Sequence, residues 1–228
     1  MTTTDPRLAP DPAPTEHGTF HHGARSEFNA WFFRTFDRYL NHITRQHKRS
    51  AFADIAAGDI VELGAGVGAN FAHLPPGSRV LAVEPSEAMH EQLEARAAAR
   101  GLDLIVIGAY GEDLPIPDAS VDEVLCSLVL CTVDDPEAVL AEIRRILRPG
   151  GRFRFVEHVA APSWSPRRWL QHAIRRPWSW VFEGCDLCRD TAATIEVAGF
   201  RQVAIRRARL KRSAFVPVNT AISGCAVR

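Results

Sequence analysis

The chain has 228 residues, 46% of them hydrophobic and 24% charged, which is the composition of one globular domain rather than of a disordered chain. Its 27 basic and 27 acidic residues cancel, but residues 1–143 carry 10 basic against 22 acidic residues and residues 144–228 carry 17 against 5. This distribution excludes a general nucleic-acid binder with a basic surface throughout.

Residues 1–18 hold four of the fifteen prolines and almost no large apolar side chains, which predicts a flexible tail. They lack the basic start and apolar core of a signal peptide. The longest apolar run, residues 124–131, is far short of the ~18 residues of a membrane span. Five cysteines, an odd number, favour free thiols in a reducing compartment. We therefore expect a cytoplasmic protein without a stable membrane anchor.

A single domain is expected over residues 19–228, and it begins with an amphipathic helix. Apolar and aromatic residues recur at spacings of three and four over about 26–52, which predicts a helix with an aromatic face. Charges of both signs lie along it, which favours a lid over a pocket. Peripheral contact with a membrane surface is the other interpretation.

Beyond this helix, short apolar strands alternate with helices. Strands are predicted over 59–63, 79–84, 104–107, 121–126, 153–159, 201–207 and 216–227. Helices are predicted over 86–100, with Ser86 placed to cap it, and over 134–147, 166–182 and 188–198. The alternation indicates an α/β fold whose parallel sheet is covered by helices on both faces.

A glycine-rich loop follows the first strand and reads Glu62-Leu63-Gly64-Ala65-Gly66-Val67-Gly68-Ala69-Asn70. Taken alone, it also fits the dinucleotide pattern G-x-G-x-x-A. A carboxylate two residues before the first glycine would repel a pyrophosphate, whereas it suits a ligand with cationic groups. The binding candidates in this loop are Glu62, Gly64, Ala65, Gly66 and Asn70.

Glu84 ends the second strand, 18 residues after Gly66, where a carboxylate can accept hydrogen bonds from both hydroxyls of a ribose. Pro85 and Met89 follow at the place where an adenine ring would rest. These residues together predict a nucleoside site at the end of the second strand.

The loop after the third strand adds Gly111, Glu112 and Asp113 to this site. Either Glu112 or Asp113 could accept a hydrogen bond from an adenine amino group, and the neighbouring Tyr110 offers a face for stacking. The residues leave open which acid does so.

The glycine loop, Glu84, the Gly-Glu-Asp-Leu-Pro loop at 111–115 and the Leu-Arg-Pro-Gly-Gly turn at 147–151 resemble the class I S-adenosylmethionine-dependent methyltransferases. The resemblance covers residues 58–160. It implies a Rossmann-like fold with a seven-stranded, mostly parallel sheet and an antiparallel last strand. It also implies S-adenosylmethionine bound at the carboxyl ends of the strands, so Ser127 and Leu128, at the end of the fourth strand, join the cofactor-binding candidates.

A narrower resemblance lies in the stretches 126–133, 155–161, 183–189 and 224–228, which are similar to the animal methyltransferase-like subgroup of thiol S-methyltransferases. It implies methyl transfer to a small, fairly apolar acceptor, with a thiol as the best single choice. The animal enzymes begin with a hydrophobic membrane anchor, whereas this chain begins with a polar, proline-rich stretch. Membrane residence is therefore not carried over.

In this layout the acceptor meets the cofactor above the ends of the fourth and fifth strands, and His158 and Asp186 are the catalytic candidates. His158 could accept the thiol proton or could be a structural histidine, and a cationic arginine could favour the thiolate. Asp186 could reach the pocket or cap the helix that follows it. The candidate aromatic walls are Trp31, Phe32, Trp164, Trp169, Trp178 and Trp180.

Cys185 and Cys188 form a C-x-x-C motif, which could suggest zinc or redox chemistry. The chain has no second C-x-x-C, and His158 and His172 are not at finger-like spacing. No metal is therefore expected.

Three other functions stay open. The first is N-, O- or C-methylation of a natural product or lipid headgroup, and the second is a non-enzymatic cofactor-binding module. The third is RNA methylation, for which the basic run at 206–212 would be suited. No base-clamping motif or added RNA-binding domain is visible, so we expect no nucleic-acid partner.

The charge split suggests a cofactor half and an acceptor half, whose arginines could steady a thiolate. The sequence leaves the oligomeric state open.

Overall fold

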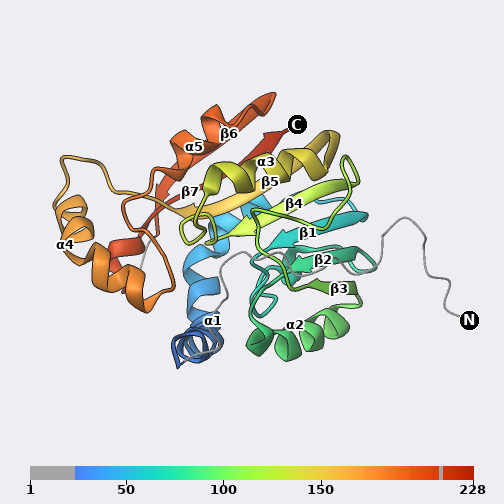
Figure 1. Cartoon of the computed structure of the whole chain (residues 1–228), viewed down its shortest axis with the longest axis horizontal. Helices are drawn as coiled ribbons and strands as arrows, with labels where there is room; N and C mark the ends of the chain where they lie inside the picture. The colour runs from blue at the N-terminus through green and yellow to red at the C-terminus, as the bar shows by residue number, and fades with distance from the viewer. Residues whose placement is uncertain (1–23, 211–212) are drawn as a thin grey trace, which may run out of the picture.

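The computed structural model describes residues 24–210 and 213–228, so the tail expected at 1–18 lies outside the described residues. Its centre is a seven-stranded sheet of order β3-β2-β1-β4-β5-β7-β6 (Figure 1). The strands are β1 (Asp59–Leu63), β2 (Arg79–Val83), β3 (Asp103–Ile107), β4 (Val121–Ser127), β5 (Leu147–His158), β6 (Gln202–Arg209) and β7 (Thr220–Val227). Neighbours from β3 to β5 pair in parallel, whereas β7 pairs antiparallel with β5 and β6. The expected sheet is confirmed.

Helices cover both faces of this sheet. They are α1 (Ala24–Ala51), α2 (Glu87–Arg100), α3 (Pro136–Ile146), α4 (Pro166–Val181) and α5 (Thr191–Val197). In Figure 1, α3 and α5 lie above the sheet, α1 and α2 lie below it, and α4 stands out at the left. The core follows this division: one buried cluster joins α3 and α5 to the sheet, and a second joins the end of α1 and α2 to the other face. Within the described residues, no helix is both long and apolar enough to cross a membrane.

Several element ends differ from the sequence-based expectation: β5 begins at Leu147 rather than at 153, and α5 begins at Thr191 rather than at 188. Ser86 precedes α2, but its side chain makes no capping hydrogen bond. Its backbone N–H donates instead to Oε1 of Glu84 at 2.9 Å, so the start of α2 is tied to the end of β2. The last strand begins only at Thr220, because residues 216–218 form a short 3₁₀ turn that contains a proline, which cannot donate to the ladder.

Ion pairs between the acidic and basic parts of the chain account for part of the charge split. The arginines that open the basic part reach back to acids on β1, β4 and the loop before β4. These pairs are Arg145–Asp118 (2.6 Å), Arg148–Asp122 (2.6 Å), Arg148–Asp59 (3.4 Å) and Arg154–Glu123 (2.7 Å). The opposite charges therefore hold neighbouring strands and loops together.

Candidate active site

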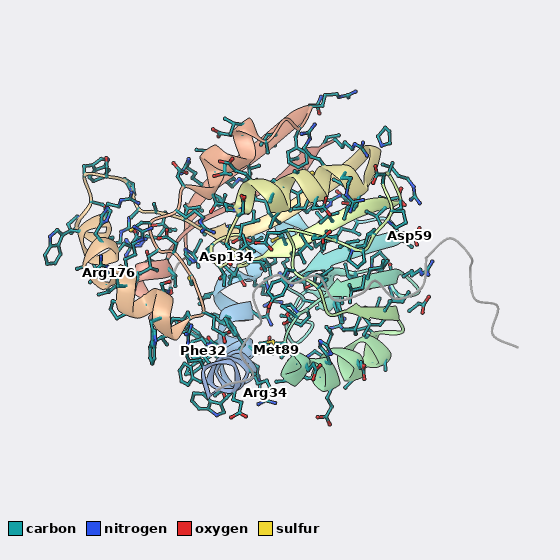
Figure 2. All side chains as sticks on the ribbon, in the orientation of Figure 1. Phe32, Arg34, Asp59, Met89, Asp134 and Arg176 are labelled. Carbon is teal, nitrogen blue, oxygen red and sulfur yellow. The ribbon has the colours of Figure 1, made fainter. Side chains whose placement is uncertain are left out.

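A cavity of about 1260 Å³ opens at the carboxyl ends of the parallel strands. Phe32 of α1, Met89 of α2 and Asp134 of the loop after β4, all labelled in Figure 2, line it from three different elements. Its volume exceeds the roughly 300–1,000 Å³ of a usual small-molecule pocket, so it has room for two ligands side by side. The cavity lies where open α/β sheets bind their ligands.

The glycine loop after β1 forms the floor of one end of the cavity. Gly64 and Gly66 have φ values of +59° and +55°, a left-handed conformation that residues with a side chain rarely adopt. A Cβ at Gly64 would also clash with the side chain of Val129. The bare backbone therefore passes close to the cavity, and Gly64, Ala65 and Gly66 all line it as expected.

Glu84, at the end of β2, fixes this loop. Its Oε2 accepts a hydrogen bond from the backbone N–H of Gly66 at 2.8 Å, and its Oε1 accepts from the N–H of Ser86 at 2.9 Å. The carboxyl is buried and lines the cavity. Burial raises its pKa above the ordinary value, although these two hydrogen bonds lower it. Each oxygen keeps a second lone pair, so Glu84 can still accept from a pair of ligand hydroxyls.

Glu62 is fully buried behind the loop and does not itself line the cavity. Its Oε1 accepts from Nδ2 of Asn70 at 2.8 Å, and Asn70 is the residue that reaches the cavity wall. Burial, the largest influence, raises the pKa of Glu62 to about 7, while Asn70 and Lys48 lower it. The structure therefore places Glu62 beneath the site, in contact with Asn70 rather than with the cavity.

The raised pKa of Glu62 makes the stability of the fold depend on pH. The proton is held more tightly in the folded chain, so its stabilising effect is complete below pH 4.5 and is lost as the pH rises through about 7. Between pH 5 and pH 8, we expect the parent protein to lose about 2 kcal/mol of unfolding free energy through this group.

Glu62→Gln mimics the protonated acid and should remove that loss, which denaturant unfolding at the two pH values measures. The control is Glu94→Gln, on the exposed side of α2, which should follow the parent. An equal pH dependence in the parent and in Glu62→Gln would contradict this account of the buried carboxyl.

The remaining cofactor candidates divide into those that reach the cavity and one that does not. Lining it are Pro85, Met89, Gly111, Glu112, Ser127 and Leu128. Asp113 does not line it, so Glu112 is the acid of this loop that does. Oε1 of Glu112 accepts from the backbone N–H groups of Asp134 and Asp135 at 3.2 and 3.3 Å, which also ties this loop to the start of α3.

The other end of the cavity is mostly apolar, and His158, the last residue of β5, lies in its wall. Phe32 packs edge-on against Phe182 and Phe215 there, with ring centroids 5.2 and 5.8 Å apart. Trp178 also lines this end. The other four expected wall residues, Trp31, Trp164, Trp169 and Trp180, are exposed instead.

The structure changes the expected positions of two kinds of charged residue near the acceptor, Asp186 and the arginines. Asp186 pairs with Arg175 at 2.8 Å and does not line the cavity. It is also not the cap of α5, since that helix begins after Asp190, whose side chain accepts from the N–H of Ala193. Among the described residues, the basic side chains lining the cavity are Arg25 and Lys48 of α1. The described arginines of residues 144–228 therefore lie outside the cavity wall, and a thiolate-steadying role for them stays a prediction.

The two cysteines of the C-x-x-C motif point to different partners. Sγ of Cys188 lies 3.7 Å from Nδ1 of His172, whereas Sγ of Cys185 lies 3.1 Å from Nε2 of His158 and 3.9 Å from Sγ of Cys131. Cys131 was not a site candidate, because 54 residues separate it from Cys185 in the sequence. A spacing pattern cannot find such a pair.

Comparisons with known proteins agree with this geometry. A family model described as a methyltransferase domain matches residues 61–155. Among solved structures, a chain of the complex between the Haloferax volcanii Trm112 methyltransferase activator and its methyltransferase covers 90% of this chain and 99% of its own, with TM-score 0.66 and 21% identity. A Thermotoga maritima S-adenosylmethionine-dependent methyltransferase covers 89% and 99%, with TM-score 0.62 and 21% identity. Fold and site together define a class I S-adenosylmethionine-dependent methyltransferase.

Curated relatives narrow this class. Human thiol S-methyltransferase TMT1B is 38% identical over 79% of this chain and 78% of its own length, and human TMT1A is 35% identical over 77% and 76%. Rat TMT1B is 41% identical over 63% of this chain, and the match spans 60% of the rat protein. The chain belongs to the family that contains these TMT1 proteins.

Proposed function

We propose that this enzyme transfers a methyl group from S-adenosylmethionine to the sulfur of a small, fairly apolar thiol. The observation that carries the proposal is one continuous cavity that joins the glycine loop and Glu84 to an apolar end beside His158. Support for sulfur as the acceptor atom comes from the relatives, which are named thiol S-methyltransferases.

The residues at the glycine-loop end fit the cofactor. Oδ1 of Asn70 and Oγ of Ser127 are buried in the cavity wall, and neither has a hydrogen-bond partner among the described residues. Buried polar atoms of this kind are costly unless a ligand satisfies them. The cavity wall carries six acidic side chains and two basic ones, which suits a ligand with ammonium and sulfonium groups.

Glu84 would hold the ribose hydroxyls, and Glu112 is the acid placed for the adenine. When bound, S-adenosylmethionine supplies an electrophilic methyl group. The chain's own residues then have to align the acceptor, exclude water and let the thiol lose its proton. An alkyl thiol has a pKa near 8.5, so about a few per cent is already thiolate at pH 7 and modest help is enough.

His158 is the residue we assign to this proton. Burial is the largest influence on its pKa and lowers it, but Cys131, Glu157 and Asp186 together raise the pKa above its ordinary value. Nε2 faces Cys185, and Nδ1 is buried without a partner among the described residues. We assign Asp186 the role of positioning the turn that carries Cys131, because its backbone N–H donates to the carbonyl oxygen of Cys131 at 2.8 Å.

We assign the role of a lid to α1. Asn29 donates to the carbonyl oxygen of Val181 at 2.9 Å, so the start of α1 is linked to the end of α4 across the apolar end of the cavity. Phe32 on the same helix supplies part of the apolar wall. A reducing compartment such as the cytoplasm remains our proposal for its location, supported by five free cysteines.

The apolar acceptor end is tested with alkanethiols of increasing chain length. Each CH₂ buried against Phe32, Phe182 and Trp178 contributes about 0.8 kcal/mol, so kcat/KM should rise about fourfold per CH₂ until the cavity is filled. The measurement is formation of S-adenosylhomocysteine by purified protein. Phe182→Ser should flatten the dependence on chain length, whereas Phe200→Ser, outside the cavity, should preserve it. Absence of turnover with every thiol, despite tight cofactor binding, would overturn the proposed function.

A further inference from the structure

Three potential metal ligands meet in the wall of the acceptor end: Cys131, His158 and Cys185. They are only 2%, 4% and 7% exposed, yet all three line the cavity. One ligand atom from each lies within 4.8 Å of the other two. They come from the turn after β4, the end of β5 and the segment between α4 and α5, which the fold brings together.

Hydrogen bonds hold two of these segments, the turn after β4 and the segment between α4 and α5, at close range. Asp186 N–H donates to the carbonyl oxygen of Cys131, and Arg189 donates to the carbonyl oxygens of Leu130 and Val133 at 2.6 and 2.8 Å. Gly184 has a φ of +100°, and a Cβ there would lie 2.9 Å from the carbonyl oxygen of Thr132. The two cysteines are therefore set by the backbone and need no movement of a flexible loop to meet.

The spacing of the two sulfur atoms is close to that of a tetrahedral thiolate site. Zn–S bonds of about 2.3 Å place two sulfurs of a tetrahedron about 3.8 Å apart. The observed distance between the Sγ atoms of Cys131 and Cys185 is 3.9 Å. The observed 3.1 Å from Cys185 to Nε2 of His158 is shorter than the roughly 3.6 Å of such a site, so the ring would shift by about half an ångström.

We propose that Cys131, His158 and Cys185 bind a zinc-class divalent cation, with the fourth coordination position open to the cavity. Two thiolates, a neutral imidazole and a divalent ion form a neutral group, which suits a buried place. Three protein ligands with one open position are the arrangement of catalytic rather than structural zinc.

An indole N–H lies against the sulfur of Cys185. Nε1 of Trp178 donates to Sγ at 3.3 Å. Such a donor to a ligand sulfur is an outer-shell contact that tunes metal sites.

This inference deepens the proposed function and rests on it for the role of the ion. An acceptor thiol would lose its S–H bond and form a sulfur–metal bond, its proton would pass to water, and no atom would be oxidised or reduced. His158 would then be a ligand rather than the base, because an imidazole bound through Nε2 carries its own proton on Nδ1.

Cobalt(II) titration of the full chain, stripped of metal by a chelator and kept reduced, tests the site without cofactor or acceptor. We expect one equivalent to bind and to give the visible bands of a tetrahedral cobalt–thiolate site. Cys131→Ser and Cys185→Ser should weaken binding by about 100-fold or more, beyond the effect of an outer-shell change. Cys188→Ser, the other cysteine of the C-x-x-C motif, is the matched control and should bind like the parent.

S-adenosylmethionine binding by each serine variant establishes that it is folded. Failure of the reduced parent to bind cobalt or zinc would overturn the metal site, as would binding that survives in Cys131→Ser and is lost in Cys188→Ser. A reduced parent that binds no metal but forms a Cys131–Cys185 disulfide on air oxidation would assign the pair to redox chemistry instead.

Addition of an alkanethiol to the cobalt-loaded protein separates this inference from the proposed function. A change in the sulfur-to-cobalt absorption with the thiol, and none with the alcohol of equal chain length, supports the open position. Cobalt bands without any methylation of thiols would leave the metal site standing and refute the thiol methyltransferase. Thiol methylation by a protein that binds no metal would refute the metal site and leave the thiol methyltransferase standing.

Discussion

Replacement of Glu84 by alanine is expected to weaken S-adenosylmethionine binding by about 100-fold or more. The carboxylate accepts hydrogen bonds from the N–H groups of Gly66 and Ser86, and it is the group we propose for the ribose hydroxyls. Hydrogen bonds to a charged group contribute about 1.5–3 kcal/mol each, so losing two of them accounts for a change of this size. Calorimetric titration of the purified variants measures it.

Glu84→Gln keeps one acceptor oxygen and should lie between the parent and the alanine variant. Glu91→Ala removes an exposed glutamate from α2, outside the cavity, and should bind like the parent. An unchanged dissociation constant for Glu84→Ala would show that the ribose assignment is wrong.

The largest stability effect is expected at Arg154, on β5. Its side chain is 7% exposed, and its guanidinium pairs with Glu123 on β4 at 2.7 Å and donates to the carbonyl oxygens of Ala51 and Ala53, where α1 ends. Arg154→Met removes the close partner of the buried Glu123 carboxylate and leaves it with Arg152, half-exposed and 4.0 Å away, which should lower the free energy of unfolding by about 3–5 kcal/mol. Denaturant unfolding gives this number.

The matched control is Arg148→Met, because the Arg148–Asp122 pair is 40% and 54% exposed and should contribute only about 0–1 kcal/mol. The double variant Arg154→Met with Glu123→Leu removes the stranded charge and should recover much of the loss. Equal destabilisation by Arg154→Met and Arg148→Met would contradict the buried pair as the link between α1 and the sheet.

Much of the fold follows from the sequence because its signals are local. The apolar strands and the glycine loop predict the sheet, and Pro149 and the two glycines after it predict the end of the helix before β5. The carboxylate of Glu84 lies at the end of β2, as expected. Glu62 was expected near the ligand, but its full burial depends on tertiary packing, which a local sequence pattern cannot predict.

The acceptor end could be predicted only in part. Cys131 and Cys185 lie far apart in the chain, and the C-x-x-C motif pairs Cys185 with Cys188, which faces His172. The tryptophans of α4 could not be assigned to the cavity or the surface from helical spacing alone, because the orientation of α4 depends on the loops that flank it. Such contacts between distant segments exist only once the strands are paired.

The most direct test of the central claim is a competition in one reaction. Purified protein and S-adenosylmethionine with a deuterated methyl group receive equal concentrations of an alkanethiol, the alcohol and the primary amine of the same chain length. Mass spectrometry of the products is expected to show the label on sulfur alone, as the thioether. Label on the alcohol or the amine at an equal or greater rate would contradict a thiol S-methyltransferase.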